Sequence, residues 1–190
     1  MARLIIVVSY FSSTAGFSPS EWLNDKLKCS KELGQNILLV TSMTENKGIT
    51  FPENVTVIRV PSLSWRDYKY ELDYTKQEGK LRPWHLFAFP LATTLGRLFD
   101  FTFRLLAGSH SDGKWSWAIT SFPTLIFIHL LNRNAPIFAT GGPSVAQLVS
   151  ATIGRLFRAR ITLEFQDPFL GAEMKLPQRT LAALKKWSAI

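Results

Sequence analysis

The fold is decided by residues 135–150, APIFATGGPSVAQLVS. The apolar run before Thr140 is typical of a buried strand, and the residues after Pro143 have the pattern of a helix. Gly141 and Gly142 between them permit a positive φ and close approach to a ligand, and Pro143 suits the first helical turn. The N–H groups of such a turn can hold an anion, although glycine-rich turns also serve packing alone. The stretch predicts a strand–turn–helix unit with two interpretations, a ligand site or a purely structural turn.

Similar units surround this stretch along the chain. Strands are expected over residues 4–8, 36–41, 55–60, 134–140 and 160–165, and helices over residues 20–33 and 145–157, the first ending at Gly34. Near-continuous apolar strands joined by helical crossovers favour a parallel sheet. The sequence therefore predicts an α/β fold, a Rossmann-like parallel sheet with helices on both faces.

Length and composition limit the domain count and the partners. The 190 residues fit one domain, 1–190, and the formal net charge of +8 favours phosphorylated ligands or an acidic membrane surface. The basic residues lack zinc-finger spacing, heptads and an aromatic-rich RNA signature, so no nucleic acid is expected. Cys29 is the single cysteine, which excludes an internal disulfide and fits a reducing compartment. A cytoplasmic location is expected.

Two apolar segments, residues 84–107 and 117–131, occupy the middle of the chain. The first is interrupted by proline and charged residues, and the second is shorter than the roughly 20 residues that cross a bilayer. Arg97 and Arg104 lie seven residues apart, hence on one helical face. Two interpretations follow: a sheet-covering helix with a solvated basic face, or contact with an anionic membrane surface, peripheral at the inner membrane face.

Catalytic carboxylates are sought at the carboxyl ends of the strands, where open parallel sheets collect ligands. Three loops lie there, residues 12–16, 140–144 and 164–169. Asp167, just past a strand, is placed to act as a base or as an acceptor of a hydroxyl proton, and Glu164 is the alternative. Both also have structural interpretations, because Asp-Pro starts turns and Glu164 can pair with a nearby arginine.

Other kinds of site lack the residues that they need. The first loop contains neither G-x-G-x-x-G nor a P-loop lysine, and no G-x-S-x-G elbow exists. His85, His110 and His129 share no metal-ligand spacing with one another or with Cys29, so no metal site is expected. His129 lies in an apolar run and is interpreted as a histidine at the edge of the core.

Four segments together resemble the amino-terminal domain of a GT-B glycosyltransferase of the family 4 type. They are residues 5–11 (IIVVSYF) with Gly16, residues 112–117 (DGKWSW), residues 137–144 (IFATGGPS) and residues 161–169 (ITLEFQDPF). The pair T-G-G-P-S and D-P-F is their most specific signal. Gln166 stands where the family commonly has arginine or histidine, and Phe169 where it has tryptophan, so the positive charge common at that place is missing.

The resemblance implies that the chain is the acceptor-binding half of a nucleotide-sugar-dependent glycosyltransferase that retains anomeric configuration. The carboxyl-terminal domain that binds the donor is missing from residues 1–190, so we expect an incomplete, inactive amino-terminal half of a GT-B fold: an enzyme fragment, or a half that needs a partner polypeptide. No cofactor is expected, because the nucleotide sugar is a substrate. The expected acceptor is a glycan or lipid-linked molecule of surface polysaccharide synthesis.

The same resemblance implies the substrate-binding residues and puts Asp167 near the transfer site. The substrate-binding residues are Ser13, Thr14, Gly16, Thr140, Gly141, Gly142, Pro143 and Ser144. Two other functions stay open. One is a non-catalytic α/β module that binds an anionic ligand or a partner domain, and the other is a fragment of a sugar-nucleotide epimerase, a class that shares the GT-B architecture.

Overall fold

The computed structural model describes residues 3–12, 18–43, 50–62, 76, 79, 83, 90–91, 94–98, 101–102, 114, 116–141 and 145–165. Its strands are β1 (Leu4–Ser9), β2 (Asn36–Ser42), β3 (Val55–Val60), β4 (Ile137–Ala139) and β5 (Ile161–Leu163). Its helices are α1 (Ser18–Glu32), α4 (Trp117–Leu131) and α5 (Val145–Phe157).

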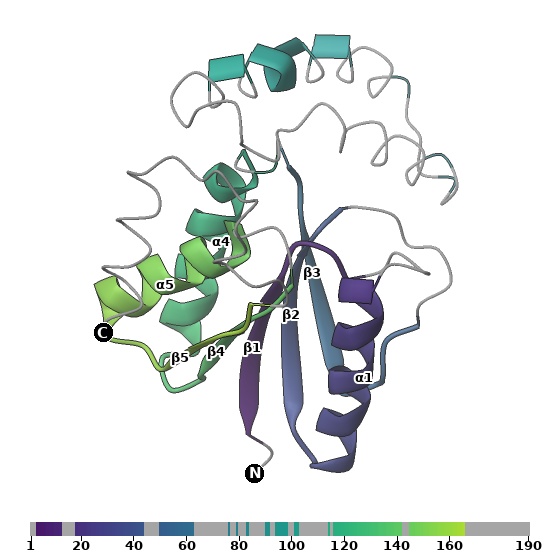
Figure 1. Ribbon diagram of the computed structural model, residues 1–190, viewed down its shortest axis with the longest axis vertical. Helices are drawn as coiled ribbons and strands as arrows, with labels where there is room; N and C mark the ends of the chain where they lie inside the picture. Colours follow the sequence, from purple (N-terminus) through teal and green to yellow (C-terminus); the bar gives the residue numbers. More distant parts are fainter. Residues whose placement is uncertain are drawn as a thin grey trace, which may run out of the picture.

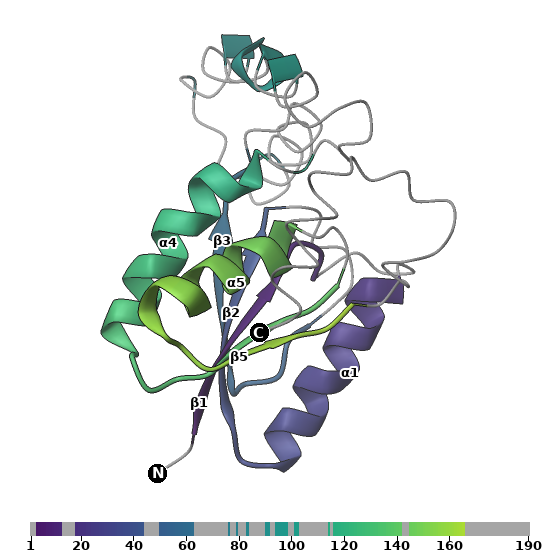
Figure 2. The same cartoon turned by 60° about the vertical axis from the view of Figure 1, so that its left-hand side comes forward.

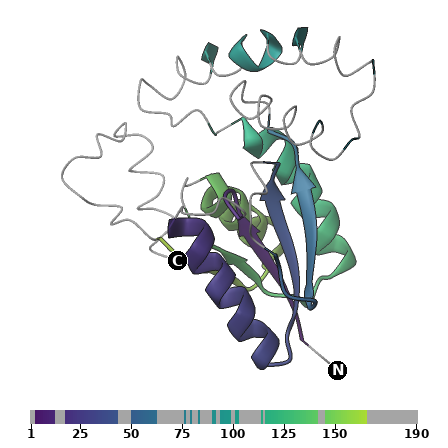
Figure 3. The same cartoon turned by 90° about the vertical axis from the view of Figure 1, so that its right-hand side faces the viewer.

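The strands form one five-stranded parallel sheet in the order β3-β2-β1-β4-β5 (Figure 1). Val8 at the centre of the sheet lies beside Val40 of β2 and Ala139 of β4. Helix α1 covers one face of the sheet, and α4 and α5 cover the other (Figures 1 and 3). Figure 2 shows α4 and α5 side by side on their face. The predicted α/β class with a Rossmann-like sheet is confirmed.

Two apolar cores lie on the two faces of the sheet. Ile6 and Val8 belong to the core under α4 and α5, whereas Val7 belongs to the core under α1, together with Leu23 and Leu27 of that helix. Successive side chains of a strand point to opposite faces, so a strand covered on both sides is apolar at every position. This geometry explains the unbroken apolar run of β1 in the sequence.

Helix α1 ends at the predicted glycine. Gly34 has a φ of 63°, its N–H donates to the Lys31 carbonyl, and the N–H of Gln35 donates to the Ser30 carbonyl. These two bonds form a Schellman motif, which needs a residue in the left-handed region after the helix. The helix therefore stops where the sequence predicts and turns directly into β2.

Strands β4 and β5 are shorter than predicted, at three residues each. Before β4, the N–H of Ala135 closes a turn on the Asn132 carbonyl, and Pro136 has no N–H to donate to a neighbouring strand. Beyond β5, the N–H of Glu164 still donates to the Ala139 carbonyl at 2.8 Å. The pairing thus continues one residue past the strand and holds Glu164 at the carboxyl edge of the sheet.

Only part of the predicted basic helix falls within the described residues. Residues 94–98 are helical and Arg97 is exposed, whereas Arg104 lies outside the described residues. Among the helices that the structure describes, none combines the length and the apolar character needed to cross a membrane.

Candidate functional site

The candidate site lies where the strand order reverses, between β1 and β4 at the carboxyl edge of the sheet. From β1 the chain continues through α1 on one face, and from β4 it continues through α5 on the other (Figure 1). In open α/β sheets, ligands usually bind in a crevice at such a point, and we call the place between the ends of β1 and β4 the crevice. Of the predicted residues of the first loop, Ser13, Thr14 and Gly16 lie outside the described residues.

Gly141 ends β4 at this crevice in a conformation that favours glycine. Its φ is 89°, and an added Cβ would lie 3.1 Å from the Ser9 hydroxyl oxygen of β1. Both the backbone angle and the close neighbour disfavour any side chain here. The positive φ expected in the T-G-G-P-S turn is confirmed at Gly141, while Gly142, Pro143 and Ser144 lie outside the described residues.

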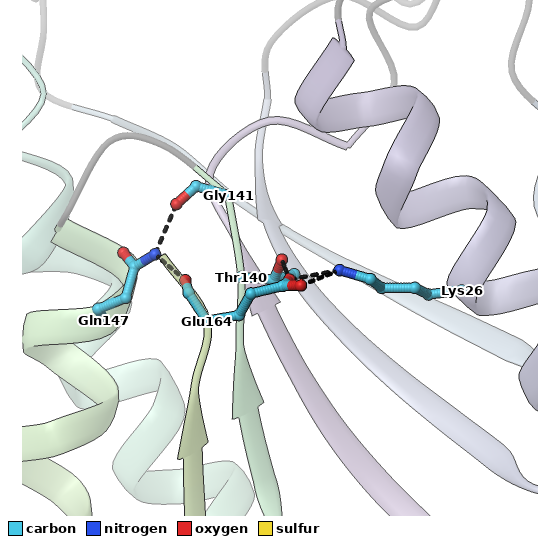
Figure 4. A network of polar contacts seen from close by, with 5 residues as sticks. All are labelled: Lys26, Thr140, Gly141, Gln147 and Glu164. Carbon is cyan, nitrogen blue, oxygen red and sulfur yellow. Dashed lines mark hydrogen bonds and ion pairs between the residues drawn. The ribbon is translucent and has the colours of Figure 1, made fainter. Parts of the chain in front are cut away.

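Glu164 joins three elements at the edge of the crevice (Figure 4). Its carboxylate accepts hydrogen bonds from the Lys26 ammonium group of α1 and from the Thr140 hydroxyl group that follows β4. Burial raises the pKa of Glu164, but these two hydrogen bonds and the charge of Lys26 lower it by more. The net pKa therefore lies below the ordinary value. At neutral pH the carboxylate is therefore ionised and already hydrogen-bonded to Lys26 and Thr140, which makes it a weak general base. Its partner is a lysine, not the arginine considered from the sequence.

Gln147 links the ends of β4 and β5 to the first turn of α5 (Figure 4). Its Nε2 donates to the Gly141 carbonyl at 2.5 Å and to the Glu164 carbonyl at 2.9 Å. The side chain is buried, and its Oε1 has no hydrogen-bond donor within the described residues. One amide thus sets the spacing of the two strand ends, because both carbonyls must converge on a single nitrogen.

Hydroxyl groups fix the direction in which the chain leaves β1. The Ser42 hydroxyl donates to the Tyr10 carbonyl at 2.7 Å, and the hydroxyl oxygens of Thr41 and Ser12 are 2.7 Å apart. The Ser9 hydroxyl donates to the Phe11 carbonyl at 2.8 Å. All these hydroxyl groups are buried, so the backbone after β1 has hydrogen-bond partners where the parallel ladder ends.

A cation lies over the aromatic residues that follow β1. The Lys114 Nζ is 4.1 Å from the ring centroid of Phe11 and 4.6 Å from that of Tyr10, both within the range of cation–π attraction. The Tyr10 ring in turn packs edge-on against Trp117 at 5.3 Å. The start of α4 therefore brings a positive charge to the β1 end of the crevice.

The structure brings together Thr140, Gly141 and Glu164 of the residues expected from the sequence. Asp167 lies outside the described residues, so its catalytic role stays a prediction. Sequence reasoning missed Lys26 and Gln147. The available signal for Gln147 was a polar residue on the apolar side of α5, but Lys26 lies 138 residues from its partner and no local pattern connects them.

The hydroxyl groups at this edge of the sheet are buried and hydrogen-bonded within the chain. Within the described part of the chain, no three His, Cys, Asp or Glu side chains are placed to hold a metal ion. A scan against models of known protein families finds no match, and a search of curated proteins finds no relative. The fold class therefore stands on the structure itself, and the resemblance to glycosyltransferases remains a prediction.

Proposed function

We propose that the crevice between β1 and β4 binds the acceptor in a nucleotide-sugar-dependent glycosyl transfer. The observation that carries the proposal is the position of Gly141 at the switch point of the sheet, where its φ of 89° favours glycine and an added Cβ would lie 3.1 Å from the Ser9 hydroxyl oxygen. Ligands approach the backbone most closely where a side chain is lacking. The T-G-G-P-S segment, which contains Gly141, and the D-P-F segment, residues 167–169, add the resemblance to the family.

In this proposal the Lys26–Glu164 ion pair is structural. It holds the end of β5 against α1 and β4, so that the chain after Glu164 starts from a defined position. Asp167 follows three residues later in the sequence and has the role of orienting or deprotonating the acceptor hydroxyl group. The division of labour follows from charge, because a carboxylate that is already paired has little basicity left for a substrate.

The donor nucleotide sugar binds mainly to a second domain in this proposal, as the family resemblance implies. The cation described near the end of β1 is Lys114, which lies over the rings of Tyr10 and Phe11. A nucleoside diphosphate needs several N–H donors or cations around its phosphates. We therefore expect this chain to recognise glycans in preference to nucleotide sugars.

The proposal is tested by saturation-transfer NMR of the 190-residue chain with N-acetylglucosamine, cellobiose and maltose. We expect saturation transfer to sugar protons in the wild type and its loss in Gly141→Ala. Gly34→Ala is the matched control, because Gly34 also has a positive φ but has open space around an added Cβ. Circular dichroism of both variants shows whether the fold is kept.

Two results would contradict the proposal. The first is equal saturation transfer in the wild type and in folded Gly141→Ala, which would place glycan binding elsewhere. The second is absence of glycan binding together with micromolar affinity for UDP-glucose, about −8 kcal/mol. That second result would favour a self-contained module that binds an anionic ligand.

A further inference from the structure

A second pocket lies at the opposite end of the sheet from the crevice, beside the amino ends of β4 and β5. It has a volume of about 570 Å³ and is lined by the turn between α4 and β4 and by the turn between α5 and β5. Arg133 comes from the first turn, Arg158 and Arg160 from the second, and His129 and Phe157 from the two helix ends. The two turns bring three arginines to one concavity from positions about 25 residues apart in the sequence.

The positive charge of this pocket has no acidic counterpart in the described part of the chain. No aspartate or glutamate is among the lining residues, and none of Arg133, Arg158 and Arg160 forms an ion pair within the described residues. The ion pairs found among the described residues involve lysines of α1, which lies on the other face of the sheet. Three like charges that surround one concavity raise the local concentration of anions.

Helix capping does not account for these arginines. At the end of α4 the Asn132 side chain donates to the Ile128 carbonyl, and its backbone N–H donates to the His129 carbonyl. At the end of α5 the Ala159 N–H donates to the Gly154 carbonyl. Arg158 itself has a φ of 52°, in the position after a helix where glycine fits without strain. Backbone geometry thus favours glycine there, and the arginine contributes charge.

His129 lines the pocket and is itself a buried residue. The residue is 3% exposed, and its Nδ1 has no hydrogen-bond partner within the described residues. Its ring lies 5.5 Å from the Phe157 ring. Burial and the nearby charge of Arg133 lower the pKa of His129, so the imidazole is neutral at physiological pH. The imidazole therefore lines the pocket without adding to its positive charge.

We infer that this pocket is a binding site for a phosphate group, held by Arg133, Arg158 and Arg160, with His129 in its wall. Guanidinium groups match the oxygens of phosphate in paired hydrogen bonds, which favours phosphate over a simple halide. The ligand is either a soluble phosphorylated molecule or the phosphate of a lipid headgroup. The site is separate from the crevice and does not rest on the proposed glycosyl transfer.

The site is tested by titrating the 190-residue chain with inorganic pyrophosphate. Calorimetry and NMR of the His129 ring monitor the binding. We expect saturable binding and a shift of the His129 signal. The double variant Arg133→Gln and Arg160→Gln should bind about tenfold or more weakly, since each hydrogen bond to a charged group contributes substantially. Lys28→Gln is the control, because it removes a positive charge from α1 outside the pocket.

Arg158→Gly separates a binding role from a structural one. Glycine relieves the positive φ, so we expect this variant to melt at a higher temperature than the wild type without pyrophosphate and yet to bind pyrophosphate more weakly. A structural role would change stability alone. Unchanged pyrophosphate affinity in both Arg158→Gly and the double variant would overturn the soluble-ligand form of the inference.

Sedimentation with vesicles distinguishes the lipid source. Vesicles of phosphatidylglycerol and of phosphatidylcholine both carry phosphate, but only the first is anionic. Binding to phosphatidylglycerol that the double variant loses and that Lys28→Gln keeps would assign the site to a lipid phosphate. Pyrophosphate binding without vesicle binding would assign it to a soluble ligand. Equal behaviour of wild type, double variant and control in both assays would overturn the inference.

Discussion

At the scale of single residues, Glu164 shows how one carboxylate connects layers of the molecule that are distant in sequence. It accepts hydrogen bonds from Lys26 on one face of the sheet and from Thr140 at the strand edge, while its own carbonyl binds Gln147 of the other face. The side chains of Lys26 and Glu164 are 39% and 33% exposed, so water screens the ion pair. The stabilisation that they provide is therefore modest and depends on pH.

We predict that Glu164→Gln lowers the free energy of unfolding at pH 7 by about 0.5–1 kcal/mol, the usual size for a screened pair. The folded-state pKa of Glu164 lies below its ordinary value of 4.5, so the carboxylate stabilises the fold above that value and this contribution disappears as pH falls through the folded-state pKa. Urea unfolding at pH 7, 5, 4 and 3 measures the free energy of unfolding of the wild type and of Glu164→Gln. Their difference should shrink below about pH 4.5, and a difference independent of pH would contradict the ion pair. Lys28→Gln is the control, because Lys28 lies on the same helix as Lys26 and pairs with the exposed Asp25.

We predict that His129 contributes a loss of stability on acidification at higher pH than Glu164 does. The pKa of His129 in the folded state lies below the ordinary 6.5, so the unfolded chain binds more protons between those two values. The wild type should therefore lose stability as pH falls through 6.5, with the loss complete below the folded-state pKa. Replacement by glutamine should flatten the pH dependence of the unfolding free energy between pH 7 and 5. An equal slope in the two proteins would show that His129 keeps an ordinary pKa.

At the scale of secondary-structure elements, the contact between α5 and β5 depends on Gly154. A Cβ built on this helical glycine would lie 2.8 Å from Cγ2 and 2.9 Å from Cδ1 of Ile161. The helix therefore approaches the edge strand more closely than a residue with a side chain would permit. Gly154 lowers the helix propensity of α5 in exchange for this close packing.

We predict that Gly154→Ala destabilises the protein by about 1 kcal/mol, because overpacking costs more than the roughly 1 kcal/mol that alanine gains in helix propensity. In the background Ile161→Ala the same change should stabilise the protein, since the opposing side chain is then removed. Thermal unfolding of the four proteins in this cycle measures the coupling. A stabilising effect of Gly154→Ala in both backgrounds would mean that the contact with Ile161 does not limit the packing.

At the scale of the whole molecule, the central strands have more support than the edges. β1 pairs along six residues with β2 and along three with β4, and both its faces are covered. Within the described residues β5 pairs with β4 alone, along three residues, and Ile161 and Thr162 are exposed. Local opening requires the least loss of buried contacts at such an edge.

We therefore predict that backbone amides of β1 and β2 exchange with solvent only through global unfolding, whereas those of β5 exchange through local opening at lower free energy. Hydrogen exchange followed by NMR in low urea distinguishes the two. Amides that open globally become faster with urea in proportion to the surface exposed, and locally opening amides change little. Equal urea dependence in β1 and β5 would show that the sheet opens as one unit.

Much of the fold could be predicted because its signals are local. The apolar runs of β1 and β3, the glycine after α1 and the pattern of α5 each lie within a few residues, and the structure confirms them. The lengths of β4 and β5 could not be predicted, because they depend on pairing with a neighbour and on the turn that closes at Asn132. The sequence also contained no sign that Lys26 would reach Glu164.

The sequence by itself determined the α/β class, the positions of the strands and helices, and the glycine that ends β4, because hydrophobic periodicity and φ preferences act between near neighbours. The tertiary structure decided the strand order, the pairing of Glu164 with Lys26 and Thr140, and the three arginines around one pocket at the far end of the sheet. These features join residues that are distant in the chain. Side chains from separate turns become neighbours only when the sheet brings the ends of its strands together.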